Sequence, residues 1–487
     1  ISIPCGKKVK ELKKLYLRFL VRSRSHDTKD KNKIIGISYL QITNEDGSVI
    51  KDMHCYLPIN RIETEIEPIV MNGCFIPLKF QSFSINNWQN NPDKLKEFLE
   101  IKVKVVSTQL TQNVTLLNLL SFPTYENLDE NHYQCLLGYL NELSSLKEEQ
   151  TSEIVKFLQA ILDKLIDILL DLKNKNEKIN EKTIEFHRMS IQPRVFEILV
   201  FIFQIIENQS KYASFRSVID AYLEKNFCIT LVHKPILRIL YQLLSATYEK
   251  YKSTRINGEF DRNSLSGNFE TNEERLVDQK SFNSRSSVNS NYSEINDELT
   301  INAIKSIEYI FKFAFRSREL LSIYNKSNNI NTKGETFNKD IEDIFKLMVE
   351  FTKLDPKKTS SIYESMADIS PQAKITKIQS FILKNVVNLI TILLISNRYS
   401  IESISKLYVG FFESRFVLQT QFLSKIIKTK LFEFSESRKI LLEPMCKVIA
   451  HYLTYENDNE CDKINQGIQT LGKITAELMN VLEKQKI

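Results

Sequence analysis

The sequence is poor in the residues that make tight turns. Among its 487 residues there are 11 glycines and 11 prolines, well below the average use of both in globular proteins. Because glycine and proline mark turns, their scarcity favours long helices over a chain built mostly of β-strands. A chain of this length also exceeds one ordinary hydrophobic core, so we expect two or more domains.

The sequence also lacks the spacings that carry metal or covalent chemistry. Its seven cysteines are scattered and none stands as Cys-x-x-Cys, which we interpret as reduced thiols in a cytosolic protein. None of the six histidines lies in His-Glu-x-x-His, and no Gly-x-Ser-x-Gly motif is present. Gly467 and Gly472 have the spacing of a phosphate-binding loop, but Ile474 stands where Ser or Thr should bind magnesium. We therefore predict no catalytic residue, no metal and no cofactor.

Long apolar runs are missing as well. The longest, near residues 196–206 and 386–395, fall short of the roughly 20 residues that span a bilayer. Position 1 is Ile rather than Met, and we expect the chain to be a segment of a longer protein.

The charge of the chain is unevenly distributed. The net charge is +6, yet residues 1–33 contain eleven basic and three acidic side chains, and residues 253–298 contain five basic and nine acidic ones. Such a basic stretch suits an anionic membrane, where each basic residue gains about 1 kcal/mol near a charged leaflet. A solvated loop that only aids solubility is the alternative. We do not expect nucleic acid as a partner, since no aromatic residues interleave the basic loop.

The first part of the chain, residues 1–106, has the pattern of β-strands. Apolar residues alternate with others around Leu17 and Phe19, and Asp46-Gly47 is typical of a hairpin turn. We predict a partial antiparallel β-sandwich whose first strands lie upstream of Ile1. The strands are expected near residues 15–21, 34–43, 49–57, 75–83 and 101–106.

The rest of the chain is predicted to be helical, so the fold class is mixed but mainly α. Helix pairs recur about every 40 residues, which suits an armadillo or HEAT-like α-solenoid over residues 107–252 and 299–487. Between these parts we predict a disordered Ser/Asn-rich insertion at 253–298. The apolar stripes lie near residues 154–169, 196–206, 215–227, 236–248, 301–321, 341–351, 378–395, 407–422, 440–453 and 464–482.

Five strings of residues resemble the DOCK (dedicator of cytokinesis) family. Residues 17–31 (LRFLVRSRSHDTKDK) and 44–52 (NEDGSVIKD) resemble its C2-type domain, in which a strand runs into a basic loop. Residues 107–120 (STQLTQNVTLLNLL) are similar to the junction between that domain and the helical region. Residues 153–159 (EIVKFLQ) and 310–318 (IFKFAFRSR) resemble two further landmarks.

The resemblance implies a function. DOCK proteins activate Rho-type small GTPases of the Rac/Cdc42 class by nucleotide exchange, and their C2-type domain binds phosphatidylinositol trisphosphate through basic loops. The resemblance thus identifies candidate lipid-binding residues in the loop after the first strand: Arg22, Arg24, Lys29, Lys31 and Lys33.

The resemblance also bears on organisation and partners. The armadillo-like helices would join the C2-type domain to a catalytic exchange region, which we expect downstream of Ile487. The expected location is the cytoplasm, with recruitment to the plasma membrane. Adaptor proteins, and a second copy of the parent protein, are further expected partners. Two alternatives stay open: a solenoid adaptor that binds proteins without lipid, and an enzyme with an unrecognised site.

Overall fold

The computed structural model describes most of the helices and part of the β region. The chain divides into two compact units: residues 1–123 with 141–161, and residues 124–140 with 162–487. The described residues are 16–24, 31–42, 48–50, 52–61, 97–104, 111–123, 130–145, 151–172, 180–208, 210–263, 297–328, 336–354, 371–413, 422–453 and single residues between 472 and 483.

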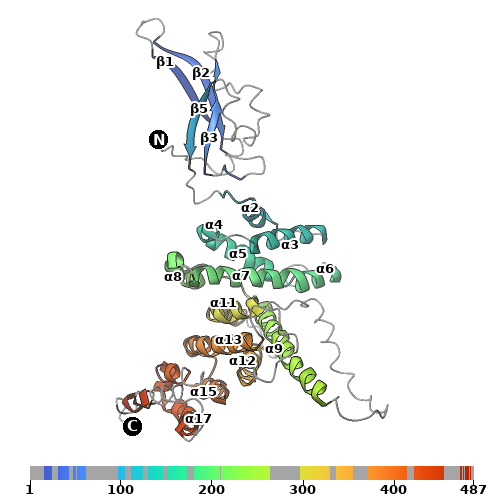
Figure 1. The fold of residues 1–487 in the computed structure, drawn as a ribbon, viewed down its shortest axis with the longest axis vertical. Coiled ribbons are helices and arrows are strands. Elements are labelled where there is room, and N and C mark those ends of the chain that lie inside the picture. The colour runs from blue at the N-terminus through green and yellow to red at the C-terminus, as the bar shows by residue number, and fades with distance from the viewer. Residues whose placement is uncertain are drawn as a thin grey trace, which may run out of the picture. The chain divides into compact units, whose positions relative to one another are not determined.

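The first unit contains two antiparallel sheets (Figure 1). One sheet has the order β1-β2-β4 and the other pairs β3 with β5. The predicted strand at 75–83 and the turn at Asp46-Gly47 lie outside the described residues. The strands are β1 (Tyr16–Arg24), β2 (Lys31–Gln41), β3 (Met53–Pro58), β4 (Asn60–Arg61) and β5 (Phe98–Val103).

The core of this unit forms between the two sheets, which makes it a β-sandwich. Leu17 and Phe19 of β1 point to the same side and pack against buried residues of the other strands, as the period-two pattern predicts. The buried centre consists of Leu40, Ile50, Cys55 and Leu57, and Met53, Leu99, Ile101 and Val103 also pack against it.

The junction string at 107–120 ties the strands to the first helix. The backbone N–H of Val49 donates to the Thr111 carbonyl at 3.2 Å, and the Thr111 hydroxyl donates to the Glu153 carboxylate at 2.9 Å. Asn113 caps helix α2 (Val114–Ser121), where its side chain accepts a hydrogen bond from the Leu116 N–H. Helix α2 therefore starts at a specific side-chain cap.

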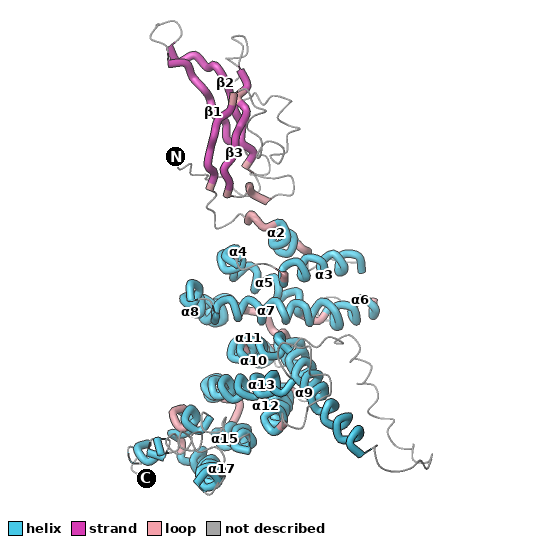
Figure 2. Tube along the Cα trace, viewed as in Figure 1, coloured by secondary structure: helices cyan, strands magenta, loops and turns pink. Residues whose placement is uncertain are grey.

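The second unit is helical (Figure 2). Helices α3 (Glu130–Ser144) and α5 (Leu158–Leu169) contribute to both units, and α4 (Thr151–Lys156) belongs to the first. The remaining α-helices are α6 (Glu181–Phe186), α7 (Gln192–Asn208), α8 (Arg216–Ala221), α9 (His233–Asn263), α10 (Asp297–Lys305), α11 (Ile307–Ser327), α12 (Phe337–Lys353), α13 (Pro371–Asn385), α14 (Leu389–Ile395), α15 (Ile401–Val409) and α17 (Ser435–Leu453).

Helices of the second unit pack mostly against near neighbours in the chain. The contacting pairs include α7 with α10, α9 with α11 and α12, α10 with α13, and α15 with α17. Aromatic side chains fill the spaces between them, such as Phe203 of α7 against Tyr309 and Phe313 of α11. Packing of this local kind is typical of an α-solenoid, so the predicted mainly α class is confirmed.

The predicted edge of the insertion differs from the observed helix. Helix α9 continues to Asn263, so the boundary placed at 252/253 falls inside it, and α10 begins at Asp297. The apolar positions alone did not reveal this extension, because residues after 252 carry few of them. Residues 264–296 lie outside the described part of the chain.

Two described helical segments are long and apolar enough to cross a membrane by length and composition, although the uninterrupted runs within them are short. They are Glu181–Asn208 and Ala373–Ile395, and 67% and 50% of their most apolar windows are buried inside the protein. Core helices of globular proteins have the same character.

Candidate functional site

Four of the five predicted basic residues, Arg22, Arg24, Lys31 and Lys33, lie toward one end of the β1–β2 ladder, and we call this end the basic tip. Arg24, near the end of the ladder on β1, pairs with Lys31, the first residue of β2, and Arg22 pairs with Ile34. The Arg22 side chain is exposed. For Arg24, Lys31 and Lys33 the structure gives the strand position, while Lys29 lies outside the described residues. Antiparallel pairing therefore brings basic residues from both sides of the loop together.

The ladder is irregular next to this tip. The register shifts between Val21 and Arg22 and again between Arg22 and Arg24. Such β-bulges bend a strand and redirect its side chains, and they are common beside functional sites. The bulge lies between the part of β1 that packs in the core, around Leu17 and Phe19, and the part that carries the basic tip.

The base of the tip is held firmly. Ile34 and Ile37 are each 1% exposed, and Gly36 leaves room for Ile59, since a Cβ at position 36 would lie 2.5 Å from the Ile59 Cγ2 atom. Asn60 donates a side-chain hydrogen bond to the Ile37 carbonyl. The backbone that carries Lys31 and Lys33 thus continues into a buried strand.

A neighbouring arginine, Arg61, already forms an ion pair within the β unit. The Arg61 Nε donates to both carboxylate oxygens of Glu97 at 3.1 Å. This hydrogen bond lowers the pKa of Glu97 and raises that of Arg61. Arg61 is therefore an ion-pair partner between β4 and the start of β5, not an added cation of the tip.

The residue types of the tip, arginine and lysine, are those that proteins use to bind phosphate groups. Arginine can hold phosphate oxygens with two parallel N–H groups, whereas lysine adds a mobile point charge. No group of three metal-ligating side chains occurs among the described residues. Burial raises the pKa of the Cys55 thiol, which keeps it protonated and unsuited to nucleophilic attack.

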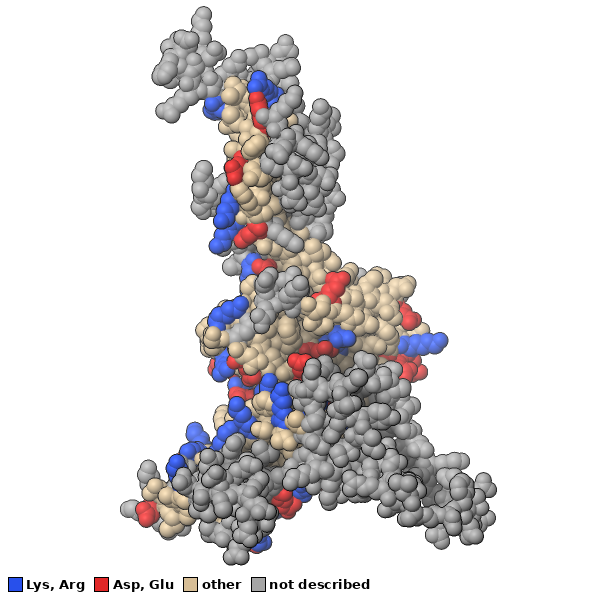
Figure 3. Space-filling model, in the orientation of Figure 1, with Lys and Arg blue, Asp and Glu red and all other residues tan. Residues whose placement is uncertain are grey.

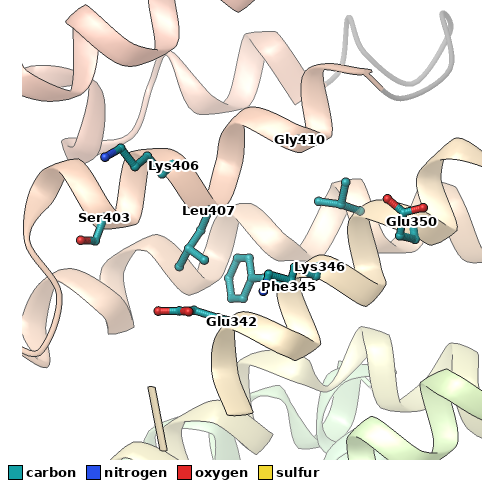
Figure 4. A pocket seen from close by; sticks show the side chains of 9 residues that line it. Glu342, Phe345, Lys346, Glu350, Ser403, Lys406, Leu407 and Gly410 are labelled. Atoms are coloured by element: carbon teal, nitrogen blue, oxygen red, sulfur yellow. The ribbon is translucent and has the colours of Figure 1, made fainter. Parts of the chain in front are cut away.

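A groove between α12 and α15 was not predicted from the sequence. It has a volume of about 410 Å³, and Figure 4 shows Phe345 and Leu407 facing each other across it. A side chain at Gly410 would crowd Val349, so the glycine keeps the two helices close. The isolated glycine within a helical pattern is the one signal the sequence offered. The groove is lined by Glu342, Phe345, Lys346, Val349, Glu350, Ser403, Lys406, Leu407 and Gly410.

An antiparallel sandwich with a basic tip, followed in the chain by neighbour-packed helices, defines a β-sandwich domain joined to a helical region. A family model described as the dedicator of cytokinesis (DOCK) TPR region matches residues 138–261 and 284–487. A second, the C2 domain in Dock180 and Zizimin proteins, matches residues 2–115. The chain therefore belongs to the DOCK family, and the resemblance drawn from its sequence is confirmed.

Individual relatives agree with this assignment. Dedicator of cytokinesis protein 3 from mouse is 25% identical over 447 residues, which covers 90% of this chain and 18% of the relative, and the human protein 3 is equally similar. Mouse dedicator of cytokinesis protein 4 is 25% identical over 478 residues, covering 96% of this chain and 20% of the relative. The chain thus spans about a fifth of the length of these relatives.

Proposed function

We propose that this chain is the membrane-recruiting and scaffold segment of an exchange factor for Rho-type small GTPases of the Rac/Cdc42 class. The β unit would bind phosphatidylinositol trisphosphate through the basic tip, Arg22, Arg24, Lys29, Lys31 and Lys33, and so bring a cytoplasmic protein to the plasma membrane. The helical unit would hold a catalytic exchange region that lies outside this chain.

One observation carries the lipid-binding part of the proposal. The pairing of Arg24 with Lys31 gathers basic residues from before and after the loop at one end of the ladder. The domain that carries them matches the family's C2 model, which supports a membrane role. Each basic residue near an anionic leaflet contributes about 1 kcal/mol, so several acting together give useful affinity.

The test is charge reversal at the tip. The variant Arg22→Glu/Arg24→Glu/Lys29→Glu/Lys31→Glu should lose binding to vesicles that contain phosphatidylinositol trisphosphate. Loss of four favourable contacts corresponds to about 1,000-fold weaker binding at low salt, which is below detection in a flotation assay. Binding that survives this change would mean that the tip is not the lipid site.

A matched control uses the opposite end of the same unit. The Ile50 N–H donates to the Ile42 carbonyl at 2.9 Å, at the end of β2 far from the tip. Two exposed lysines lie at this end: Lys102 on β5 and Lys104, which follows β5. Their position is fixed by Val103, which lies between them and pairs with Met53 at the start of β3. Lys102→Glu/Lys104→Glu should leave vesicle binding unchanged, while Arg22→Glu/Lys31→Glu, with the same change in charge, should weaken it by about 30-fold.

A second candidate function is a protein-interaction scaffold without lipid binding. The groove between α12 and α15 favours it, because Phe345 and Leu407 give an apolar floor and Glu342 and Lys406 a charged rim. The vesicle experiment separates the two functions. A scaffold that does not bind lipid would give equal, weak vesicle binding for the tip variant and the unchanged chain.

A further inference from the structure

Four lysines from three separate segments gather on the helical unit, and we call them the lysine face. Lys377 and Lys384 lie on α13, Lys305 ends α10, and Lys425 lies in the helical residues 422–426. The Lys425 ammonium donates to the Lys384 carbonyl at 3.1 Å, and the Lys305 ammonium lies 4.7 Å from the centre of the Phe381 ring. Figure 3 shows several Lys and Arg side chains on the surface of the helical unit.

These ammonium groups have few compensating charges. Within the described part of the chain, none of the four forms an ion pair with a carboxylate, whereas nearby Lys374 pairs with Asp297 at 3.5 Å. The carboxylates of Glu207 and Glu298 act on Lys305 from a greater distance. The face therefore keeps a net positive field that an anionic partner would satisfy.

Neighbouring lysines also perturb one another. Burial lowers the pKa of Lys305, and the charges of Lys377 and Lys384 lower it further. Burial and Lys384 do the same for Lys425. An anion placed among them would relieve this repulsion, because opposite charges favour the charged form of each amine.

The face continues along α13 and α14 at helical spacing. Positions 377, 381, 384, 388, 391 and 395 follow steps of three and four, and their side chains are exposed or half-buried. Phe381 lies between the lysines, and Ile395 at the far end is 72% exposed. Lysines beside exposed apolar side chains on a helix surface are typical of segments that lie on anionic membranes.

We propose that the lysine face is a second membrane-contact surface, which binds anionic phospholipid bilayers such as those rich in phosphatidylserine. Its chemistry is non-specific charge attraction with shallow apolar contact by Ile395, unlike a phosphate pocket that selects one headgroup. It lies in the helical unit and does not depend on the basic tip for its structure.

The test uses vesicles of phosphatidylserine and phosphatidylcholine without phosphoinositide. The four-residue tip variant serves as the background, so that the tip cannot contribute. In it, Lys377→Glu/Lys384→Glu/Lys425→Glu should weaken binding by about 100-fold. The matched control reverses three exposed lysines that are already paired with acids on their own helices and do not line the groove: Lys252, Lys353 and Lys447. Equal binding by the two triple variants would overturn the proposal.

Two further measurements distinguish loss of charge from misfolding, and a membrane from an acidic protein partner. Lys377→Gln/Lys384→Gln/Lys425→Gln removes the charge without reversing it, and should also lose binding while unchanged circular dichroism confirms that it folds. A polyglutamate peptide replaces the vesicles in the second arm. Loss of peptide binding with vesicle binding retained would identify an acidic protein partner instead, against the proposal. If the tip variant still bound vesicles that contain phosphatidylinositol trisphosphate, that result would contradict the proposed function and leave the lysine-face proposal untouched.

Discussion

Single polar side chains fix one helix against another in the helical unit. The Gln379 amide on α13 donates to the Phe351 carbonyl at 3.0 Å and to the Leu354 carbonyl at 2.8 Å, at the end of α12. The Tyr408 hydroxyl on α15 donates to the Val386 carbonyl at 2.8 Å. Each bond satisfies a buried backbone carbonyl, whose loss would cost about 1–3 kcal/mol.

His233 is a buried histidine whose imidazole ring stays neutral at ordinary pH. Its side chain is packed at the start of α9 with Nδ1 3.2 Å from the Ser317 Oγ atom, and its ring lies against Phe337. Burial lowers the pKa of His233, and the nearby charges of Arg318, Lys234 and Arg398 contribute, which together bring it to about 3.

This depressed pKa predicts acid sensitivity. The unfolded imidazole takes up its proton near its ordinary pKa, whereas the folded one does not, so stability from His233 is complete above about pH 6.5 and falls as the pH drops toward 3. Between about pH 7.5 and about pH 5 the loss should be about 2 kcal/mol. Urea unfolding followed by circular dichroism should show a smaller loss in His233→Gln, which cannot titrate. The exposed His132→Gln should behave like the unchanged chain, and an equal pH dependence in both variants would contradict the assignment.

Between elements, helix α12 comes very close to Gly410, the residue that follows α15. A Cβ added at Gly410 would lie 2.8 Å from Val349 Cγ1 and 3.0 Å from Val349 Cγ2. The backbone φ of Gly410 is −60°, which any residue adopts, so the space alone excludes a side chain. This contact also forms one wall of the groove between the two helices.

A double-mutant cycle tests the contact. Gly410→Ala should destabilise the helical unit by about 1–3 kcal/mol, because it overpacks the interface. In Gly410→Ala/Val349→Ala the shortened valine makes room, so the double variant should be more stable than the sum of the single effects by at least about 0.5 kcal/mol.

The control glycine is Gly138 in α3, where an added Cβ meets nothing within 4 Å. Gly138→Ala should stabilise the chain by about 0.5–1 kcal/mol through helix propensity alone. Additive effects at positions 410 and 349, measured by thermal or urea unfolding, would exclude a tight contact.

At the scale of the whole molecule, each of the two units carries its own group of basic residues. The β unit carries the basic tip and the helical unit carries the lysine face, and the described residues contain no cluster of metal ligands. The regions matched by family models are the C2 and TPR regions of the DOCK family.

The proposed scaffold role predicts no exchange activity in the 487-residue chain itself. The rate of GDP release from a Rac- or Cdc42-class GTPase, followed with a fluorescent nucleotide, should be the same with and without the chain. Chelation of the bound magnesium serves as the positive control, since it speeds nucleotide release directly. Acceleration by the chain would place exchange residues within it and would overturn the scaffold proposal.

Much of the architecture could be predicted because its signals are local. Alternation around Leu17 and Phe19 identified a strand, and the 3.6-residue period identified most helices. The basic tip was also predictable, because one hairpin brings nearby residues such as Arg24 and Lys31 together. The end of α9 was misplaced because its last turns lack the apolar periodicity on which the prediction depended.

The sequence by itself determined the family, the two-part fold class and the placement of charge near the first strands. These follow from residues that are neighbours in the chain. Tertiary structure alone decided the lysine face and the groove between α12 and α15. Lys305 and Lys425 are brought near the same helix only when α10, α13 and residues 422–426 pack together. Hydrophobic burial drives that packing, and the packing brings lysines from separate segments close together. No local sequence pattern indicates that proximity.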